Sequence, residues 1–336
     1  MSLYKKYSLR PLFSSLVTMP RLSAAEWPTL PAITRYFIMV RAAVLVMTVV
    51  SVLVGVLMAA VDGAFHLDRL IALLVGLVAA HATNNLINDY IDSEQGLDTD
   101  NYLRRRYGVH VLQEGLVSRA RFLWAVVATG AAAVAAGVWL TISLGSDVGW
   151  LMAAGAFFVL FYTWPLKHFA LGEVSVLLVW GPLMTAGSYY VMTGTMTWHA
   201  LVIACVYGIG PTLVILGKHI DKLDQDKLKG VRSLPVVLGE KWSRYLTLTL
   251  VALQWLAIVA IYLAGMGTAW FALLLISVPG LYSMVRAFMA SRPEQKPEHF
   301  PDSIWPLWFS AFAFRFTRDF GGLLVLAVAL QLLTAD

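Results

Sequence analysis

Long apolar segments recur along almost the whole chain, and each is close to the length that crosses a lipid bilayer. A membrane-spanning helix needs about 20 mostly apolar residues, because the hydrocarbon core is about 30 Å thick. We find nine candidate spans of this kind. They cover residues 36–61, 68–90, 122–144, 148–165, 171–193, 198–217, 245–265, 268–288 and 306–333. The fourth is the weakest candidate, because it is short and reaches a proline.

The composition excludes several other classes of protein. Of the 336 residues, 59% are hydrophobic and only 13% are charged, whereas a soluble domain is usually about 45–50% apolar and about 25% charged. We therefore exclude a soluble globular enzyme, a disordered chain and a nucleic-acid-binding protein, and expect the lipid bilayer as the surrounding partner. The single cysteine, Cys205, has no partner for an internal disulfide and is expected to be a small core residue.

The basic residues are distributed unevenly between the loops on the two sides of the membrane. With a cytoplasmic N-terminus, 22 of the 25 Lys and Arg residues fall in regions on the cytoplasmic side, and the outside loops contain only Arg69. Because cytoplasmic loops carry such an excess, we expect a multi-pass protein of a bacterial cytoplasmic membrane, with the C-terminus outside. All long polar loops then face the cytoplasm, where loop-borne function should lie.

The predicted fold is all-α, with one short arm before the membrane domain. Residues 1–33 lack the continuous apolar core of a signal peptide and are expected to form a cytoplasmic arm. Its residues 12–17 have the spacing of an interfacial helix. Residues 34–336 are expected to form one transmembrane domain. An acidic loop follows both the second and the sixth span, which suggests two facing four-helix halves plus a ninth helix around a central cavity open to the cytoplasm.

A first acidic cluster lies where the second span ends, in the stretch NNLINDYIDSEQGLD. Four of its polar residues share one helical face. They are Asn85, Asn88, Asp89 and Asp92. Asp98 follows Gly96, a residue that can turn the chain back toward this face. Oxygen ligands suit Mg²⁺, which typically takes one or two carboxylates and completes its coordination with water and phosphate. The alternative is a solvated acidic helix end, but amides inside an apolar span need partners.

A second cluster of charges follows the sixth span, in the stretch GKHIDKLDQDKLKGVRSLPVVLG. Its carboxylates alternate with lysines, and a histidine lies among them. The candidate residues are Asp221, Asp224, Asp226, Lys218, His219 and Lys222. Mixed charges of this kind often serve solubility alone. The segment by itself therefore favours neither a solvated charged helix nor a binding site. Opposite the first cluster, it would supply both Mg²⁺ ligands and cations for phosphate oxygens.

Three motifs together resemble one known family. NDYIDSEQGLD at 88–98 is similar to the first acidic motif of the UbiA superfamily of intramembrane prenyltransferases, in the form of its 1,4-dihydroxy-2-naphthoate branch. DKLKGVRSLPVVLG at 226–239 resembles the end of the second motif, and FYTWPLKHFALGE at 161–173 resembles the stretch between the fourth and fifth spans. The resemblance extends over nearly the whole chain. It implies Mg²⁺-dependent transfer of a prenyl group from a prenyl diphosphate to a hydroxylated aromatic acceptor.

The resemblance also implies roles for individual residues. Asp89, Asp92 and Lys167 are the expected catalytic residues. The expected metal ligands are Asn85, Asn88, Asp89, Asp92, Asp98, Asp221, Asp224 and Asp226. The expected substrate-binding residues are Arg41, Asn85, Asn88, Tyr90, Tyr162, Lys167, Lys218, His219, Lys222 and Arg232. Lysine and arginine would add positive charge where the diphosphate leaves, and aromatic faces, with Trp164 a further candidate, would stabilise the cationic prenyl carbon.

The sequence departs from the family pattern in its second motif. Asp221 and Lys222 stand where the family often has a base followed by an acid, and Lys218 and His219 replace neighbouring amides. Arg41, which matches the arginine that opens the first span, is followed by Ala42 rather than proline. Prenylation of another acceptor, a secondary-metabolite aromatic or a carotenoid, therefore remains an alternative.

Two alternatives of other classes are a cation-coupled transporter and a non-catalytic scaffold. A transporter would also place carboxylates on facing repeats, although usually near the midplane, and a scaffold would need neither acidic cluster. The charges inside the ninth span have two interpretations of their own. A local pair between Arg315 and Asp319 is favoured over direct contact of Arg315 or Arg318 with substrate.

Overall fold

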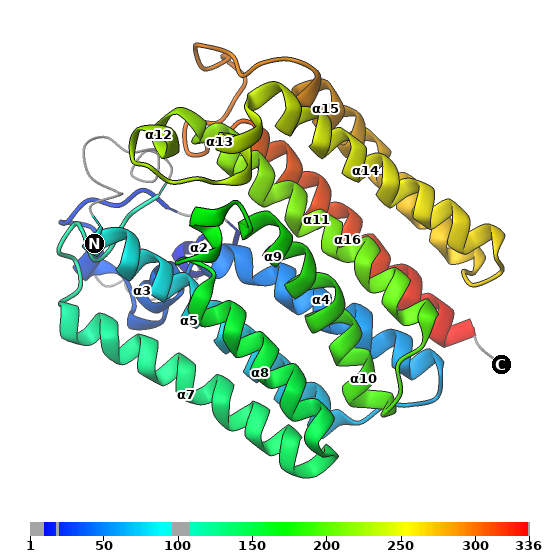
Figure 1. The fold of residues 1–336 in the computed structure, drawn as a ribbon. Coiled ribbons are helices and arrows are strands. Elements are labelled where there is room, and N and C mark those ends of the chain that lie inside the picture. The colour runs from blue at the N-terminus through cyan, green and yellow to red at the C-terminus, as the bar shows by residue number, and fades with distance from the viewer. Residues whose placement is uncertain (1–9, 18–19, 96–107, 335–336) are drawn as a thin grey trace.

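The computed structural model describes residues 10–17, 20–95 and 108–334, and the regular structure within these ranges is entirely helical (Figure 1). The α-helices are α2 (Arg10–Val17), α3 (Ala32–Met39), α4 (Ala42–Val61), α5 (Leu67–Glu94), α7 (Arg119–Leu144), α8 (Ser146–Phe161), α9 (Gly172–Leu178), α10 (Gly187–Thr193), α11 (Trp198–Asp221), α12 (Leu223–Leu228), α13 (Leu234–Leu238), α14 (Glu240–Leu263), α15 (Val278–Met289) and α16 (Phe309–Thr334). The 3₁₀-helices are η1 (Trp27–Thr29), η2 (Leu166–Phe169) and η4 (Ala269–Ser277), and η3 (Val179–Ala186) is a π-helix.

Eight helical segments of the described chain are long and apolar enough to cross a membrane. Two of them are composite, because α9, η3 and α10 form one segment and η4 with α15 forms another. The remaining predicted span is α8, an apolar helix of 16 residues. The expectation of an all-α, multi-pass membrane protein is confirmed, and the span predicted to be weakest is the short one.

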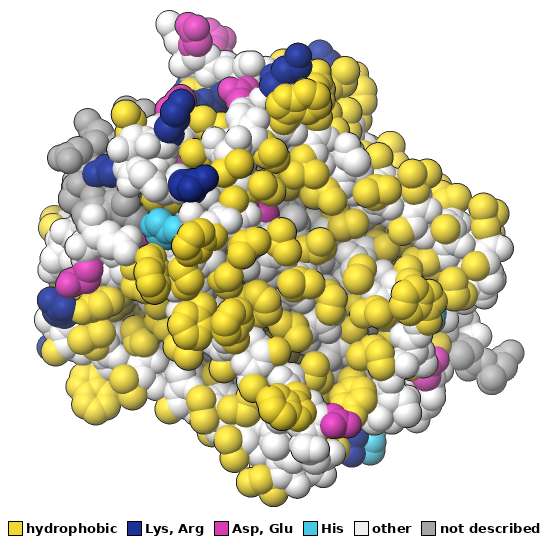
Figure 2. Space-filling model, in the orientation of Figure 1, with side chains coloured by type: hydrophobic (Ala, Val, Ile, Leu, Met, Phe, Trp, Pro, Cys, Tyr) yellow, Lys and Arg dark blue, Asp and Glu magenta, His cyan; other side chains and the backbone are white. Residues whose placement is uncertain are grey.

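Polar side chains gather at one end of the bundle, which we call the polar end. There α4, α7, α9, α14 and α16 begin, and α5, α8, α11 and α15 end. Figure 2 shows most of the visible Lys and Arg side chains near this end, at the upper left, and hydrophobic side chains over the middle of the molecule. A band of this kind matches the lipid-facing surface of a membrane protein, since lipid tails offer no hydrogen bonds.

The first predicted span, 36–61, is interrupted in the structure, which corrects the prediction. α3 ends at Met39, and Arg41 has a left-handed backbone with φ 58° before α4 begins at Ala42. A non-glycine residue at positive φ is uncommon and is held by its surroundings. The helices of the second and sixth spans continue beyond their predicted ends at residues 90 and 217, as far as Glu94 and Asp221. The two acidic clusters are therefore largely helical.

The ninth helix joins the two halves of the bundle. α16 packs against α4 of the first half and against α11 of the second, and α4 also contacts η3. Small residues allow this close approach: Gly217 lies against the backbone of Phe309 and Ser310, and Gly208 lies against Gly181. Close helix contacts in membranes typically use such small residues. The two polar clusters are thus held by one packed unit.

The π-helix η3 interrupts the fifth span beside α4. It contains Pro182, and the carbonyl of Trp180 accepts hydrogen bonds from the hydroxyls of Ser51 (3.0 Å) and Thr185 (2.7 Å). π-Segments are rare and frequently occur at functional sites. Here the segment fixes the position of Trp180, which lines the central cavity.

Gly208→Ala is expected to destabilise the bundle. A methyl group there would lie 2.8–3.0 Å from backbone atoms of Gly181 and Leu177, so α11 and the fifth span would have to separate, at a cost of about 1–3 kcal/mol. Thermal unfolding in detergent measures the effect. The control is Gly322→Ala on α16, where a methyl group meets no atom within 4 Å; equal melting temperatures for the two variants would contradict the packing argument.

Candidate functional site

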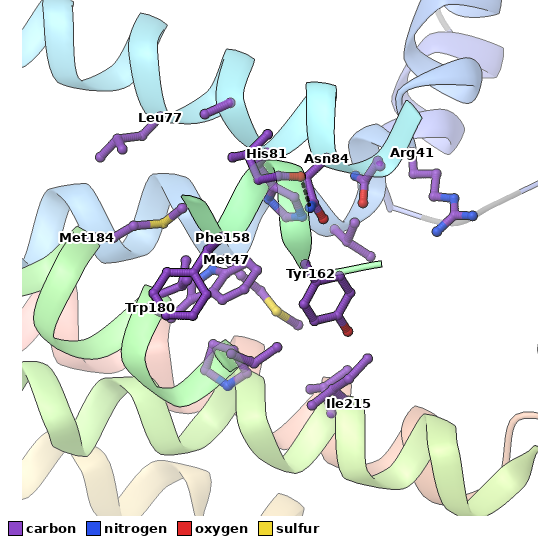
Figure 3. Close-up of a pocket in the computed structure, with 18 of the residues that line it drawn as sticks. Arg41, Met47, Leu77, His81, Asn84, Phe158, Tyr162, Trp180, Met184 and Ile215 are labelled. Carbon is purple, nitrogen blue, oxygen red and sulfur yellow. Dashed lines mark hydrogen bonds between the residues drawn. The ribbon is translucent and has the colours of Figure 1, made fainter. Parts of the chain in front are cut away.

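A cavity of about 1030 Å³ runs through the bundle from the polar end. Its wall at the polar end includes Asp92, Lys167 and Lys222, and its wall toward the opposite end includes Leu140 and Val191. Figure 3 shows the middle of this cavity, with side chains from α4, α5, α8, η3 and α11 directed into it. One end of the cavity is therefore charged and the rest is largely apolar.

Both charged clusters predicted from the sequence reach the same part of the cavity. We call this part the polar mouth. It is lined by Arg41, Asn85, Asn88, Asp92, Lys167, Lys218, His219 and Lys222. α5 and α11 both end here, because each enters the bundle from the opposite end, so their last turns meet. The structure thus brings together residues more than 120 positions apart in the sequence.

Arg41 forms a buried ion pair with Asp89 at the edge of the mouth. Its Nε lies 3.2 Å from Asp89 Oδ2, and its Nη2 donates to Oδ1 of the same carboxylate. Nε2 of the buried His110 lies 3.7 Å from Asp89 Oδ1. Asn85 donates to the carbonyl of Val40 (3.0 Å), which ties α5 to the break before α4. This two-point contact explains why Arg41 keeps its unusual backbone conformation.

Two further carboxylates at the polar end pair with lysines. Asp92 lies 3.3 Å from Nζ of Lys167, which comes from η2 between the fourth and fifth spans, and it also accepts from Asn88 (3.0 Å). Asp226 lies 3.3 Å from Nζ of Lys222. All four charged side chains in these two pairs are buried. Buried charges are costly unless paired, so these contacts account for how the mouth keeps its charges.

A buried carboxylate–imidazole pair, Glu173 with His219, lies beside these groups. Nδ1 of His219 is 2.6 Å from Oε1 of Glu173, and both side chains are 2% exposed. Oε2 of Glu173 has no hydrogen-bond partner among the described residues. Sequence reasoning did not single out Glu173. The sequence does contain a signal for this residue, because Glu173 is the last residue of the family-like segment FYTWPLKHFALGE, from which Tyr162 and Lys167 were predicted.

Deeper in the cavity the wall becomes aromatic and apolar. Phe158, Tyr162 and Trp180 line it beside Met47 and His81 (Figure 3). His81 contacts Thr48 through Nδ1 at 2.8 Å and meets Trp180 edge-on, with centroids 5.1 Å apart. Sequence analysis missed Trp180 and His81, since neither lies near a charged motif.

Tyr162 lies at the boundary between the mouth and this aromatic wall. Its ring lines the cavity beside Phe158, and its phenolic hydroxyl can donate a hydrogen bond to an anion in the mouth.

Several predicted site residues lie elsewhere. Asp98 lies outside the described residues. Asp224, on α12, and Arg232, which follows it, are exposed and do not line the cavity. The hydroxyl of Tyr90 accepts a hydrogen bond from Arg119, and Tyr90 is not among the residues that line the cavity. Trp164 is also largely exposed.

Asp221 has a clear structural partner in the ninth helix. Its two carboxylate oxygens accept the backbone N–H groups of Phe309 (3.1 Å) and Ser310 (3.0 Å), at the start of α16. The first N–H groups of a helix have no partner within it, and negative charge is favourable there. The geometry therefore gives Asp221 the role of a cap that holds α16 against α11.

The charges within α16 also differ from the expected pairing. Asp319 pairs with the adjacent Arg318, whose Nη2 lies 3.1 Å from Oδ1, instead of pairing with Arg315. Arg315 and Arg318 both line the cavity. The adjacent pair is possible because both side chains are partly exposed and extend along the helix surface.

The donor set at the mouth fits a magnesium ion that shares its coordination with a phosphate. Among the described residues, no group of three His, Cys, Asp or Glu side chains is placed to hold a metal alone. Mg²⁺ is usually held by one or two carboxylates plus substrate phosphates, and rarely by an all-protein cage. Asp92 and the amide of Asn88 provide hard oxygen donors on the cavity wall. Lys167, Lys218 and Lys222 line the same part of the wall, and their positive charge suits phosphate oxygens.

Comparisons with known proteins point to one family. A model described as the UbiA prenyltransferase family matches residues 48–312. A 2-carboxy-1,4-naphthoquinone phytyltransferase from Synechocystis sp. is 29% identical over 251 residues, which are 71% of this chain and 77% of the relative. A 1,4-dihydroxy-2-naphthoate octaprenyltransferase from Escherichia coli is 26% identical over 250 residues, which are 71% of this chain and 80% of the relative.

A solved structure shows the same fold. The structure of a UbiA homolog from Aeropyrum pernix matches with a TM-score of 0.57 and 14% sequence identity, covering 84% of this chain and 97% of that chain. Among the relatives of animals, UbiA prenyltransferase domain-containing protein 1 from Homo sapiens is 25% identical over 232 residues, or 68% of this chain and 67% of the relative.

Asp221→Ala is expected to lower stability, because two backbone N–H groups of α16 would lose their acceptor inside the protein. Loss of a helix cap costs about 0.5–2 kcal/mol. The thermal unfolding temperature in detergent should fall for this variant and stay near the wild-type value for Asp224→Ala, whose side chain is exposed. If both variants unfolded at the wild-type temperature, the capping role of Asp221 would be wrong.

Proposed function

We propose, from the premise that this chain belongs to the UbiA prenyltransferase family, that it transfers the prenyl group of a prenyl diphosphate to 1,4-dihydroxy-2-naphthoate. Membership follows from the family model, which covers residues 48–312, and prenyl transfer to an aromatic acceptor agrees with the names of the relatives. The proposed naphthoate acceptor, which would place the protein in menaquinone biosynthesis, is supported by the relatives that are named as 1,4-dihydroxy-2-naphthoate prenyltransferases. One observation carries the proposal: a charged mouth opens into a largely apolar cavity.

The polar mouth would bind the diphosphate head of the donor. Asp92, with the amides of Asn85 and Asn88 beside it, would hold Mg²⁺. Asp89 and Asp226 are the further acidic residues of the proposed set, and Asp98, also proposed as a ligand, lies outside the described residues. When bound, Mg²⁺ neutralises the diphosphate and makes it a better leaving group. Lys167, Lys218 and Lys222 present fixed positive charge to its oxygens, and fixed charge is most effective where negative charge develops in the transition state.

The aromatic wall would stabilise the donor carbon as the diphosphate leaves. The allylic C–O bond breaks, its electron pair goes to the diphosphate, and the carbon gains positive character. The π-faces of Tyr162, Phe158 and Trp180 line the cavity just below the mouth, where they would attract this cation. The electron-rich acceptor ring then forms the new C–C bond with this carbon. The ring regains aromaticity when the group on the attacked ring carbon leaves without its bonding electrons, as a proton from an unsubstituted carbon or as CO₂ from the carbon that carries the carboxylate.

The deep apolar part of the cavity would hold the prenyl chain. Its wall includes Leu73, Leu140, Val148, Met184 and Val191. A cavity inside a helical bundle also keeps water from the cationic carbon, which would otherwise be hydrolysed.

We further propose that the polar end faces the cytoplasm of a bacterial cell, with the C-terminus outside. The support is the gathering of Lys and Arg at that end together with the positive-inside rule. Residues 1–33 would form the cytoplasmic arm of a single domain spanning residues 34–336. A water-soluble diphosphate product would then leave directly into the cytoplasm.

Product formation tests the proposal. Membranes containing the protein, prenyl diphosphates of several lengths and 1,4-dihydroxy-2-naphthoate should yield a prenylated naphthalene product by mass spectrometry, with equimolar diphosphate and no turnover in excess EDTA. Asp92→Asn should reduce turnover by at least about 100-fold, because a transition-state charge contact is lost. The control is Asp68→Asn, at the opposite end of α5. Near-normal turnover of Asp92→Asn would overturn this site.

Lys167→Ala tests the diphosphate contact separately. We expect the KM for the prenyl diphosphate to rise about 10- to 100-fold, as for loss of a charged hydrogen bond, with little change in the KM for the acceptor. The matched control is Lys241→Ala, an exposed lysine at the start of α14. Wild-type kinetics for Lys167→Ala at subsaturating donor would remove Lys167 from the site.

A further inference from the structure

Two arginines of α16 line the cavity well inside the membrane-spanning part of the helix. Arg315 and Arg318 follow the first residue of α16, Phe309, by six and nine positions. At 1.5 Å per residue these positions lie about 9 and 14 Å from the polar end of a helix about 39 Å long. A cation at such depth is costly and marks function by default, with its partner to be identified.

The register of α16 on α4 places Arg315 below the polar mouth. Gly321 packs against Val50 of α4 and against Tyr207 of α11. Because α4 and α16 run in the same direction from the polar end, this contact sets Arg315 level with Val44, which also lines the cavity. Val44 follows Arg41 by three residues, so Arg315 is about one helical turn deeper than the Arg41–Asp89 pair.

Among the described residues, Arg315 differs from Arg41, Lys167, Lys222 and Arg318 of the cavity wall in having no carboxylate partner. Arg318 pairs with Asp319, and Arg41, Lys167 and Lys222 each pair with a carboxylate at the mouth. For Arg315 the described part of the chain shows neither a hydrogen bond nor an ion pair. Phe316 and Phe320, about 100° and 140° around α16 from Arg315, are buried in the core, whereas Arg315 is exposed and lines the cavity.

We propose that Arg315 binds the carboxylate of the aromatic acceptor, an inference that rests on the proposed function. A guanidinium matches a carboxylate with two parallel hydrogen bonds, and such pairs are both strong and directional. A carboxylate held one turn below the mouth would keep its charge away from the diphosphate. The acceptor ring would then lie beside the aromatic wall, between Arg315 and the donor carbon.

An acidic acceptor would then bind in preference to a neutral phenol. This preference would come from Arg315, whereas the lysines of the mouth serve the donor. The other source of an anion at this place is a lipid phosphate, because arginine side chains in membranes can extend toward head groups. The experiment must separate these two sources.

Direct binding tests the proposal without turnover. The full chain in phosphatidylcholine nanodiscs is titrated with 1-hydroxy-2-naphthoate, without prenyl diphosphate, by calorimetry. We expect Arg315→Gln to weaken binding about 10- to 100-fold, the effect of losing a charged hydrogen bond, and Arg315→Lys to recover part of the affinity. Arg286→Gln, which removes an exposed arginine stacked on Tyr282 outside the cavity, should bind as wild type. The neutral analogue 1-naphthol should bind wild type and Arg315→Gln equally.

Equal affinity of wild type and Arg315→Gln for the acid would overturn the proposal, as would absence of acid binding to wild type. So would a loss seen only in nanodiscs containing phosphatidylglycerol, which would assign Arg315 to lipid. Recovery by Arg315→Lys, with an unchanged melting temperature, excludes misfolding as the cause. The proposed function fails separately: Arg315-dependent binding without any prenylated product would contradict the reaction and leave this contact standing.

Discussion

The structure depends on three buried carboxylates that each meet a cation at the polar end of the bundle. Asp89 contacts Arg41, Asp92 contacts Lys167, and Asp226 contacts Lys222. The first pair joins the residue before α4 to α5, and the second joins α5 to η2. The third pair lies within one short segment. Because removal of one partner leaves an uncompensated buried charge, the pairs fix how α4, α5 and η2 meet around the cavity.

The same pairs suit an anion that arrives together with a divalent cation. A diphosphate attracts the lysines and arginine, and a divalent ion attracts the carboxylates, so both charges of each pair find new partners in one event. Binding of either ion alone would leave half of the charges uncompensated in a region of low dielectric. We infer that the mouth binds donor and metal as a unit, while the apolar cavity below it excludes water.

The sequence predicted those features that depend on local pattern. The length of each apolar run predicted where the helices lie. Because an even number of spans separates the two acidic clusters, both clusters were predicted at the same end of the bundle. The family match agrees with a prenyltransferase and not with a transporter or a scaffold. Features set by contacts between distant segments were not predictable. Asp221 caps α16 across 88 residues, Glu173 meets His219 through packing, and the π-helix brings Trp180 to the cavity.

The most direct test of this account is divalent-ion binding measured by electron paramagnetic resonance of Mn²⁺ with the purified protein and a slowly reacting prenyl thiodiphosphate. We expect tight Mn²⁺ binding only when the diphosphate analogue is present, and loss of that binding in Asp92→Asn. Equally tight Mn²⁺ binding without the analogue, or none with it, would contradict the claim that the mouth exchanges its internal ion pairs for a metal and a diphosphate together.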